Sequence, residues 1–233
     1  MGADVMAGGL GGIELFSGLP PPAIIEIEAV CHWHDFQAGE QVFDKDNDTL
    51  DVYFVVKGSV RILSHVSGER EVALANVEEG NYFGELAAID RKERSARVVA
   101  TEDSVLASLG GQAFVDIMMK YPVVGLRVME RLTRIIRTLD SRVTDLSTLS
   151  EAQRIYVELV RLVRPDPRRP GGWYIPDMPN HKEIAAWAGT AREAVAQAIG
   201  ELAREGVLER RSMKVVIRDW PRLQLMARGA QSH

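Results

Sequence analysis

The apolar residues between positions 129 and 146 recur at alternating spacings of three and four. They are Met129, Leu132, Ile136, Leu139, Val143 and Leu146. This is the a/d repeat of a coiled coil, and it predicts a helix of roughly seven turns over residues 122–150, with Pro122 in its first turn. A helix that packs on its own domain usually has a wider apolar face. The narrow stripe therefore favours a homodimer in which this helix pairs with that of a second copy.

The residues before this helix form short β-branched and aromatic runs that glycines separate. The clearest runs are residues 53–56, 60–63, 72–74 and 96–99. Strands at a spacing of about 8–12 residues indicate an antiparallel barrel or sandwich, with Ser67-Gly68 at a hairpin tip. Two short helical segments are expected upstream, on either side of the prolines at 20–22.

The residues after the long helix have the pattern of a small helical module. The expected helices are residues 151–163, 181–188 and 191–205, and the expected hairpin strands lie near residues 207–208 and 215–217. Gly189-Thr190 is a turn between two helices, Gly206 ends the second of them as a C′ residue, and residues 164–172 form a loop. Helix, glycine turn, helix and hairpin together predict a winged helix-turn-helix. Its core is expected from Ala185, Val195, Ile199 and Leu202.

These patterns together predict an α+β chain. It has an N-terminal antiparallel, jelly-roll-like β-barrel, a long dimerisation helix and a C-terminal winged helix-turn-helix. The expected boundaries are a flexible N-terminus at 1–12, the barrel domain at 13–121, the dimerisation helix at 122–150, the winged module at 151–222 and a tail at 223–233.

Charge is distributed unevenly along the 233 residues, whose formal net charge is -5. Residues 151–233 contain 14 Lys and Arg against 10 Asp and Glu, a net of +4, whereas residues 1–150 have a net of -9. A basic C-terminal third on an acidic body indicates a nucleic-acid-binding module attached to a second domain.

Several classes of protein are excluded by what the sequence lacks. A single cysteine, Cys31, rules out an internal disulfide and a four-cysteine zinc or iron–sulfur site, and it is expected in a core. The histidines that could serve a haem are His32, His34 and His65, but no spacing singles one out, and no metal is expected. No apolar run reaches about 18 residues and the N-terminus is not a signal peptide, so a cytoplasmic location without a membrane partner is expected. No nucleophile–base pair or glycine-rich nucleotide loop emerges, so the chain is not expected to be an enzyme.

The segment from Phe83 to Ala96 contains the most informative chemistry in the sequence. Gly84 permits close approach of a ligand to the backbone, and Glu85 opens a short helical turn whose free N–H groups can hold an anion. Arg94 follows ten residues after Gly84, where its guanidinium can meet a phosphate with the Ser95 hydroxyl as a second donor. A carboxylate beside a phosphate site fits a ligand that has both a negative charge and a sugar hydroxyl. The alternative is a surface ion pair between Arg94 and Glu85.

Phe83-Gly84-Glu85-Leu86 followed by Arg94-Ser95-Ala96 resembles the phosphate-binding cassette of cyclic-nucleotide-binding domains. The segments 15–19, 38–40 and 53–60 resemble the entry helix and early strands of the same domain. From Ile13 to about Trp220 the chain resembles the cAMP receptor protein/FNR family of bacterial transcription regulators.

This resemblance implies both the effector and the residues that bind it. Gly84, Glu85 and Leu86 would hold the ribose and phosphate of cAMP or cGMP, and Arg94 and Ser95 would bind the cyclic phosphate. The partners it implies are double-stranded DNA with a near-palindromic operator, a second copy of the chain, and RNA polymerase.

One position departs from the family pattern. Where cAMP-responsive relatives have a Thr-Ser pair that contacts adenine, this chain has Leu139-Asp140, with Thr138 one residue away. An ionised carboxylate only accepts hydrogen bonds, and guanine presents two donors on one edge, whereas adenine presents one amino group and a bare acceptor. We therefore hypothesise that cGMP competes with cAMP or replaces it. The alternative is that Asp140 pairs with Arg137 or Arg142, on its own helix or on the partner's.

Residues 190–197 resemble the recognition helix of the family. Arg192 can bind guanine and Glu193 can accept from cytosine, while Gln197 stands where relatives often have Arg and would suit adenine. The expected phosphate contacts are His181, Lys182 and Lys214.

The expected mechanism is a population shift in which the nucleotide bridges the cassette and the dimer helix. Two half-sites would then lie roughly 34 Å apart, about one DNA turn. One alternative is a relative of the same fold that is constitutive or senses another ligand. Another is a regulatory subunit that acts on a partner protein. DNA retention that disappears when Arg192 and Glu193 are both replaced would exclude the regulatory subunit.

Overall fold

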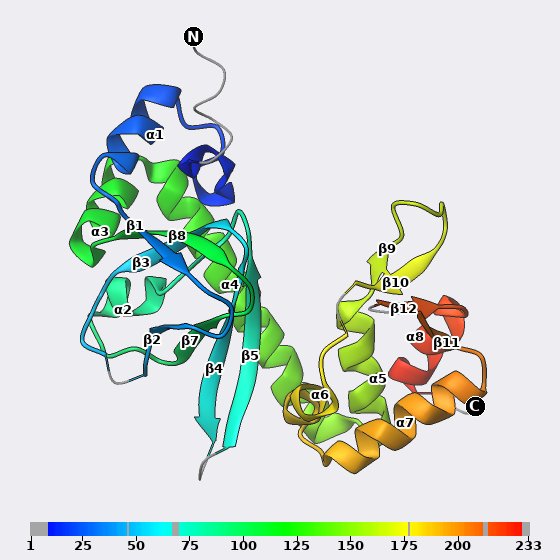
Figure 1. Ribbon diagram of the computed structural model, residues 1–233. Helices are drawn as coiled ribbons and strands as arrows, with labels where there is room; N and C mark the ends of the chain where they lie inside the picture. Colours follow the sequence, from blue (N-terminus) through cyan, green and yellow to red (C-terminus); the bar gives the residue numbers. More distant parts are fainter. Residues whose placement is uncertain (1–8, 46, 67–69, 177, 212–213, 230–233) are drawn as a thin grey trace. The chain divides into compact units, whose positions relative to one another are not determined.

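The computed structural model describes residues 9–45, 47–66, 70–176, 178–211 and 214–229 (Figure 1). The chain forms two compact units, Met1–Arg134 and Ile135–His233, and the division falls inside the long helix α4 (Pro122–Thr148). The fold is α+β with antiparallel sheets, as the sequence predicts.

The first unit begins with short helical turns and then becomes a β-roll. Its helices are η1 (Leu10–Gly12), η2 (Glu14–Phe16), α1 (Pro21–Glu28), α2 (Glu85–Asp90) and α3 (Gly111–Lys120). Its strands are β1 (His32–Phe36), β2 (Gln41–Phe43), β3 (Val52–Lys57), β4 (Ser59–Val66), β5 (Arg70–Glu78), β6 (Tyr82–Phe83), β7 (Arg97–Ala100) and β8 (Ser104–Leu109). The four predicted strand runs are therefore confirmed. The predicted hairpin tip at Ser67-Gly68 lies outside the described residues, between the paired strands β4 and β5.

Within the described residues of this unit, the strands form two four-stranded antiparallel sheets, ordered β1-β8-β3-β6 and β2-β7-β4-β5. One core lies between the sheets, because apolar residues of both contribute to it, among them Phe43, Val60 and Leu106. A second core joins the first sheet to α1, α3 and the start of α4, which cover its outer face in Figure 1. The result is the jelly-roll-like barrel predicted from the strand spacing.

Helix α4 buries one stripe and leaves another exposed. Val124 and Val128 are buried in the helix-covered core of the first unit. The predicted dimer stripe lies on a different face: Ile136 and Val143 are each 64% exposed, and Leu132 is only partly buried against the core. An amphipathic helix normally buries its apolar stripe against a neighbouring element. The exposed side chains of this stripe are therefore available to a second helix.

The second unit is a helical module with a small sheet. Its helices are α5 (Glu151–Leu162), α6 (His181–Ala188), α7 (Arg192–Arg204) and α8 (Trp220–Arg228). Its strands are β9 (Arg164–Pro165), β10 (Trp173–Ile175), β11 (Leu208–Arg211) and β12 (Lys214–Ile217). Local signals set the helix ends: Ser150 and Asn180 form capping boxes, and Gly189 and Gly206 take left-handed φ of 60° and 71°. Of the predicted core, Ala185, Val195 and Leu202 are buried and Ile199 packs partly buried against them.

Three segments differ from the sequence prediction. The segment expected as a loop contains β9, which pairs with β10 and so joins the sheet of the predicted hairpin. Residues 223–228, expected within a tail, complete α8, where Leu223 and Ala227 are buried. Leu10, expected in a flexible end, is fully buried in η1. In each case the tertiary packing orders a segment too short for a periodic signal.

A buried ionic network joins α4 to α5 inside the second unit. Glu158 is 2% exposed, and Arg142 donates from Nε and Nη2 to its two carboxylate oxygens at 3.0 and 2.9 Å. Arg161 also donates to Glu158, and its Nη2 reaches Asp145 at 2.6 Å and Ser141 Oγ at 2.7 Å. The network fixes the angle at which the C-terminal part of α4 meets α5.

Candidate functional site

The loop from β6 to α2 is built around Gly84. This residue has a φ of +87°, which L side chains rarely adopt. A Cβ at this position would lie 2.7 Å from Arg94 Nη1 and 2.8 Å from the backbone oxygen of Asp51. Glycine therefore allows the chain to turn into α2 while Arg94 lies directly against the backbone.

Arg94 is 3% exposed and is held almost entirely by neutral oxygens. It donates from Nη2 to the backbone oxygen of Asp51 (2.7 Å) and to Thr49 Oγ1 (3.2 Å), and from Nη1 to the backbone oxygen of Gly84 (3.2 Å). The guanidinium carbon lies 4.2 Å from the centre of the Phe43 ring. The sequence did not indicate Thr49 and Asp51 as partners, because the loop that supplies them lies about 40 residues upstream.

Arg94 forms no ion pair with a carboxylate in the described part of the chain, although the charge of Asp51 acts on it and opposes the fall in its pKa. The alternative ion pair with Glu85 is not formed, and the buried Nε has no hydrogen-bond partner among the described residues. Burial lowers the pKa of Arg94, but arginine starts so high that the group stays charged at neutral pH. A buried cation of this kind favours an anionic ligand.

The other cassette residues differ in their exposure. Glu85 is 6% exposed, and its carboxylate accepts no hydrogen bond from the described residues, so it can accept one from a ligand hydroxyl. Leu86 is 47% exposed and Ser95 is exposed, so both are accessible. The structure thus brings Arg94 against the backbone of Gly84, the residue that precedes Glu85.

Leu139 and Asp140 lie on the part of α4 that belongs to the second unit, and both are exposed. Within the second unit the structure excludes one alternative on the same helix, because Arg142 is bound to Glu158 rather than to Asp140. Nor does Arg137 form an ion pair with Asp140 where the chain is described.

The predicted base-reading residues share the exposed face of α7. Arg192, Glu193 and Gln197 are exposed, whereas Val195, Ala198 and Leu202 on the opposite face are buried. Gln197 Nε2 donates to Glu201 Oε1 at 3.0 Å, one turn further along. The arrangement leaves the first turn of α7 open to a DNA groove.

Arg154 holds the turn that precedes this helix. It donates from Nε to the backbone oxygen of Ala188 (2.7 Å), from Nη2 to that of Gly189 (3.2 Å) and from Nη1 to that of Leu149 (3.0 Å). The first two carbonyls lie at the end of α6 and the third lies just after α4. One side chain therefore links the ends of these two helices. The sequence alone did not suggest this role.

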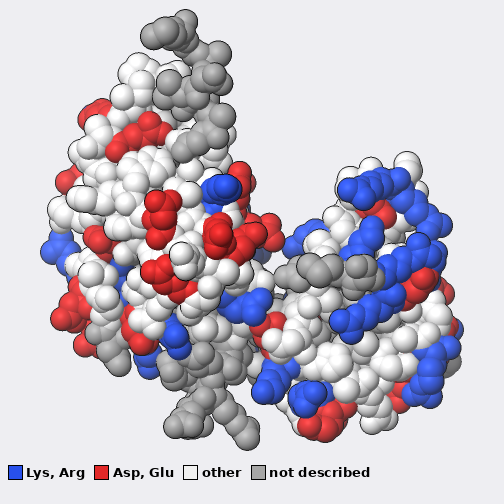
Figure 2. Space-filling model, viewed as in Figure 1, with Lys and Arg blue, Asp and Glu red and all other residues white. Residues whose placement is uncertain are grey.

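The predicted phosphate contacts are spread over the same module. Lys182 is exposed in the first turn of α6, His181 is partly buried beside it, and Lys214 Nζ lies 5.5 Å from the centre of the Tyr174 ring. Figure 2 shows Lys and Arg gathered on the second unit, while Asp and Glu are more abundant on the visible face of the first. The charge asymmetry of the sequence is therefore a surface property.

Other potential ligand residues have ordinary surroundings. Among the described residues there is no group of three or more His, Cys, Asp or Glu that could hold a metal ion. His34 Nε2 is hydrogen-bonded to Ser108 Oγ (2.9 Å), His32 is exposed, and the side chain of His65 lies outside the described part. Burial raises the pKa of the Cys31 thiol to about 12, which leaves it protonated and unreactive. No described helix is both long and apolar enough to cross a membrane.

Comparison with known proteins matches both units. The profile of the cyclic nucleotide-binding domain matches residues 33–121, and that of the Crp-like helix-turn-helix domain matches residues 153–226. The "Cyclic AMP receptor protein" of Thermus thermophilus is 30% identical over 218 residues, which cover 94% of this chain and 98% of that protein. The chain belongs to the cAMP receptor protein/FNR family. It is therefore a DNA-binding transcription regulator with a cyclic nucleotide-binding domain, and the family is one of regulators rather than enzymes.

Solved structures support the same assignment. The crystal structure of Thermus thermophilus catabolite activator protein superposes with a TM-score of 0.54 at 30% identity, over 92% of this chain and 98% of that one. The c-di-GMP responsive regulator CLP of Xanthomonas campestris superposes with a TM-score of 0.65 at 21% identity, over 85% and 99% of the two chains, and shows the fold alone.

Gly84→Ala is expected to destabilise the first unit by more than the roughly 1–2 kcal/mol of an unfavourable φ, because the new methyl group also clashes with Arg94 and Asp51. Gly39→Ala is the matched control: its φ is +85° but nothing lies within 4 Å of the added Cβ. Urea denaturation compares the two. Equal losses of unfolding free energy would contradict the close-contact role of Gly84.

Proposed function

We propose that this regulator is a homodimer switched allosterically by a 3′,5′-cyclic nucleotide, cAMP or cGMP. The observation that carries the proposal is the buried guanidinium of Arg94, which forms no ion pair with a described carboxylate, in the same cassette as the buried residue Glu85. A cyclic nucleotide supplies one negative charge and one ribose hydroxyl, which match these two groups. Leu86 and Ser95 would complete the cassette.

The proposed division of labour follows the chain. Residues 13–121 bind the nucleotide, 122–150 dimerise through the exposed stripe of α4, and 151–222 bind DNA. A nucleotide that bridges the cassette and Leu139-Asp140 would stabilise one arrangement of the paired helices. That arrangement sets the distance between two recognition helices, for a near-palindromic operator with half-sites roughly 34 Å apart. The protein would act on DNA in the cytoplasm, with RNA polymerase as its partner.

Calorimetric titration of the full chain with cAMP and with cGMP tests the proposal, alongside DNA binding measured with and without each nucleotide. Binding that also strengthens operator binding is the expected result. No heat from either nucleotide, with DNA binding intact, would overturn it.

That negative result would favour the second candidate, a regulator that is constitutive or senses another ligand. The observation in its favour is Leu139-Asp140, where cAMP-responsive relatives have Thr-Ser.

Asp140→Ser is expected to shift the ratio of cGMP to cAMP affinity about tenfold towards cAMP, because the N–H donors of guanine would no longer meet a charged acceptor on the protein. Calorimetry of both nucleotides measures the ratio. Ser147→Ala, on the exposed surface of the same helix, is the control and should leave the ratio unchanged. A wild-type protein that binds cAMP tightly and cGMP not at all would reject the guanine hypothesis.

Arg192→Ala is expected to weaken operator binding by about 1–3 kcal/mol and to relax preference at one base pair in each half-site. Lys182→Ala should instead weaken binding to all sequences evenly, because a phosphate contact does not read bases. Fluorescence anisotropy on an operator selected from random DNA, with each base pair replaced in turn, distinguishes the two. If the Arg192 variant loses affinity equally for all sequences, Arg192 does not read a base.

A further inference from the structure

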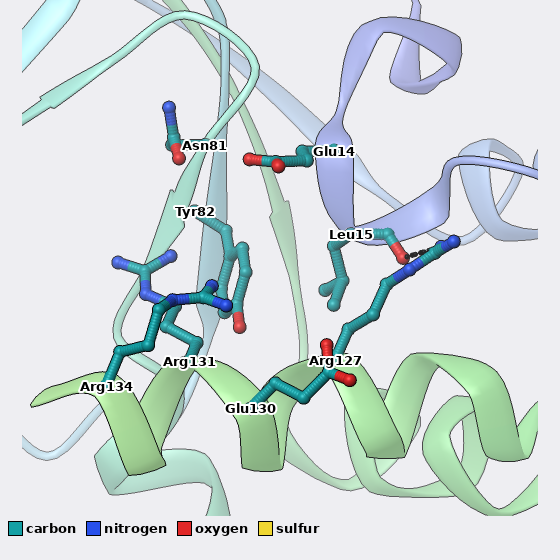
Figure 3. Close-up of a pocket in the computed structure, with 8 residues that line it drawn as sticks. All are labelled: Glu14, Leu15, Asn81, Tyr82, Arg127, Glu130, Arg131 and Arg134. Atoms are coloured by element: carbon teal, nitrogen blue, oxygen red, sulfur yellow. Dashed lines mark hydrogen bonds between the residues drawn. The ribbon is translucent and has the colours of Figure 1, made fainter. Parts of the chain in front are cut away.

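A pocket of the first unit lies outside the cassette (Figure 3). It lies between η2, β6 and the first part of α4, and includes none of the cassette residues. The side chains that line it are Glu14, Leu15, Asn81, Tyr82, Arg127, Glu130, Arg131 and Arg134.

Three of these residues are arginines on one face of α4. Arg127, Arg131 and Arg134 are spaced by four and three residues, so they project from neighbouring turns. Arg127 is fixed by the backbone oxygens of Leu15 (2.9 Å) and Ser17. The guanidinium carbon of Arg131 lies 4.2 Å from the centre of the Tyr82 ring.

The acidic residues of the pocket lie apart from Arg131 and Arg134. Figure 3 shows the guanidinium groups of Arg131 and Arg134 beside Tyr82, with the carboxylates of Glu14 and Glu130 towards the other side of the pocket. Within the described chain, Arg131 forms no ion pair with either glutamate. Among the side chains that line the pocket, positive charge is therefore concentrated at the Tyr82 side, and the carboxylate of Glu85 acts on Tyr82 from outside the lining.

Tyr82 supplies a second and independent observation. The residue is 5% exposed, and its hydroxyl has no hydrogen-bond partner among the described residues. Burial raises the pKa of Tyr82 despite the opposing charge of Arg131, so the hydroxyl keeps its proton and remains a donor. A buried donor without an acceptor is unfavourable, and a ligand oxygen in the pocket would satisfy it.

We infer that this pocket binds the phosphate group of a small phosphorylated ligand, with Arg131, Arg134 and the Tyr82 hydroxyl as donors. One guanidinium group can donate two parallel hydrogen bonds to a phosphate, and a neutral phenol adds a further donor without adding charge. The ligand is distinct from the cyclic nucleotide of the cassette, because Arg94 takes no part in the pocket.

The pocket would remain open in the proposed dimer. At 3.6 residues per turn, Arg127, Arg131 and Arg134 point away from the dimer-stripe residues Met129 and Ile136. A second copy seated on the stripe would therefore leave the arginine face accessible.

The test is calorimetric titration of the full chain with inorganic phosphate and with pyrophosphate at constant ionic strength. Arg131→Gln/Arg134→Gln is expected to weaken pyrophosphate binding at least about tenfold, because two charged donors are lost. Arg137→Gln, an exposed arginine further along α4, is the charge-matched control and should not change it. Arg94→Gln should leave the part of the binding that depends on Arg131 and Arg134 unchanged, since Arg94 does not line this pocket.

Two further variants separate a binding role from a structural one. Tyr82→Phe removes one donor and should weaken binding, whereas Glu14→Gln removes a repelling carboxylate and should strengthen it about threefold. Circular dichroism checks that each variant is folded. No binding by the wild type, binding lost in Arg94→Gln but kept in the double variant, or a Glu14→Gln variant that binds no more tightly would each overturn the inference.

Discussion

Replacing Arg94 with alanine is expected to weaken cyclic nucleotide binding by about a hundredfold, or about 3 kcal/mol. The cyclic phosphate would lose two charge-assisted hydrogen bonds and the buried cation of the cassette, which forms no ion pair with a described carboxylate. Calorimetry with cAMP and cGMP measures the loss for both nucleotides, which share the phosphate.

Arg94 also holds the backbone at Gly84 and Asp51, so loss of binding has to be separated from loss of structure. Arg94→Lys keeps the charge but loses the paired donors, and it should bind with intermediate affinity. Lys92→Ala changes an exposed cation in the same loop and should bind like the wild type. If the alanine and lysine variants fold and bind as well as the wild type, the cassette serves another purpose.

Glu158→Ala is expected to destabilise the second unit by about 3 kcal/mol, because Arg142 and Arg161 would both lose their buried partner. Urea denaturation followed by tryptophan fluorescence measures this, since Trp173, Trp187 and Trp220 all lie in the second unit. Without these ion pairs the angle between α4 and α5 would no longer be fixed, so the affinity for operator DNA should also fall.

The control for Glu158 is Glu205, which pairs with Arg222 in the same unit with both side chains largely exposed. Glu205→Ala should cost less than about 1 kcal/mol, because water screens an exposed pair. A double variant that also replaces Arg142 should cost less than the two single changes added together. If Glu158→Ala lowers the free energy of unfolding no more than Glu205→Ala does, the network does not fix the angle between α4 and α5.

The parts of the fold that follow local rules were predictable from the sequence. The helix α6 runs over the predicted residues His181–Ala188, because Asn180 caps its start and Gly189 can take the left-handed conformation at its end. The strands around residues 53–56 and 60–63 follow from runs of β-branched and aromatic residues. These signals depend only on neighbours along the chain.

The candidate site was predictable in its residues but not in its surroundings. Gly84, Glu85 and Arg94 were identified from their spacing and chemistry, yet the carbonyl of Asp51 and the hydroxyl of Thr49 that hold Arg94 were not. The structural roles of Arg154 at the helix-turn-helix and of Glu158 between α4 and α5 were not predicted either. No sequence pattern marks a polar residue that becomes buried by contact with a distant segment.

The sequence by itself determined the order of the modules, the long helix with its narrow stripe, and the chemistry of the cassette, because periodicity, glycine positions and charge are written in adjacent residues. Only the tertiary structure decided that β10 joins the sheet of the winged module, that α8 continues to Arg228, and that Tyr82 meets three arginines of α4 at one pocket. Those outcomes depend on which surfaces the packed elements bury, and burial is a property of the whole fold rather than of any segment.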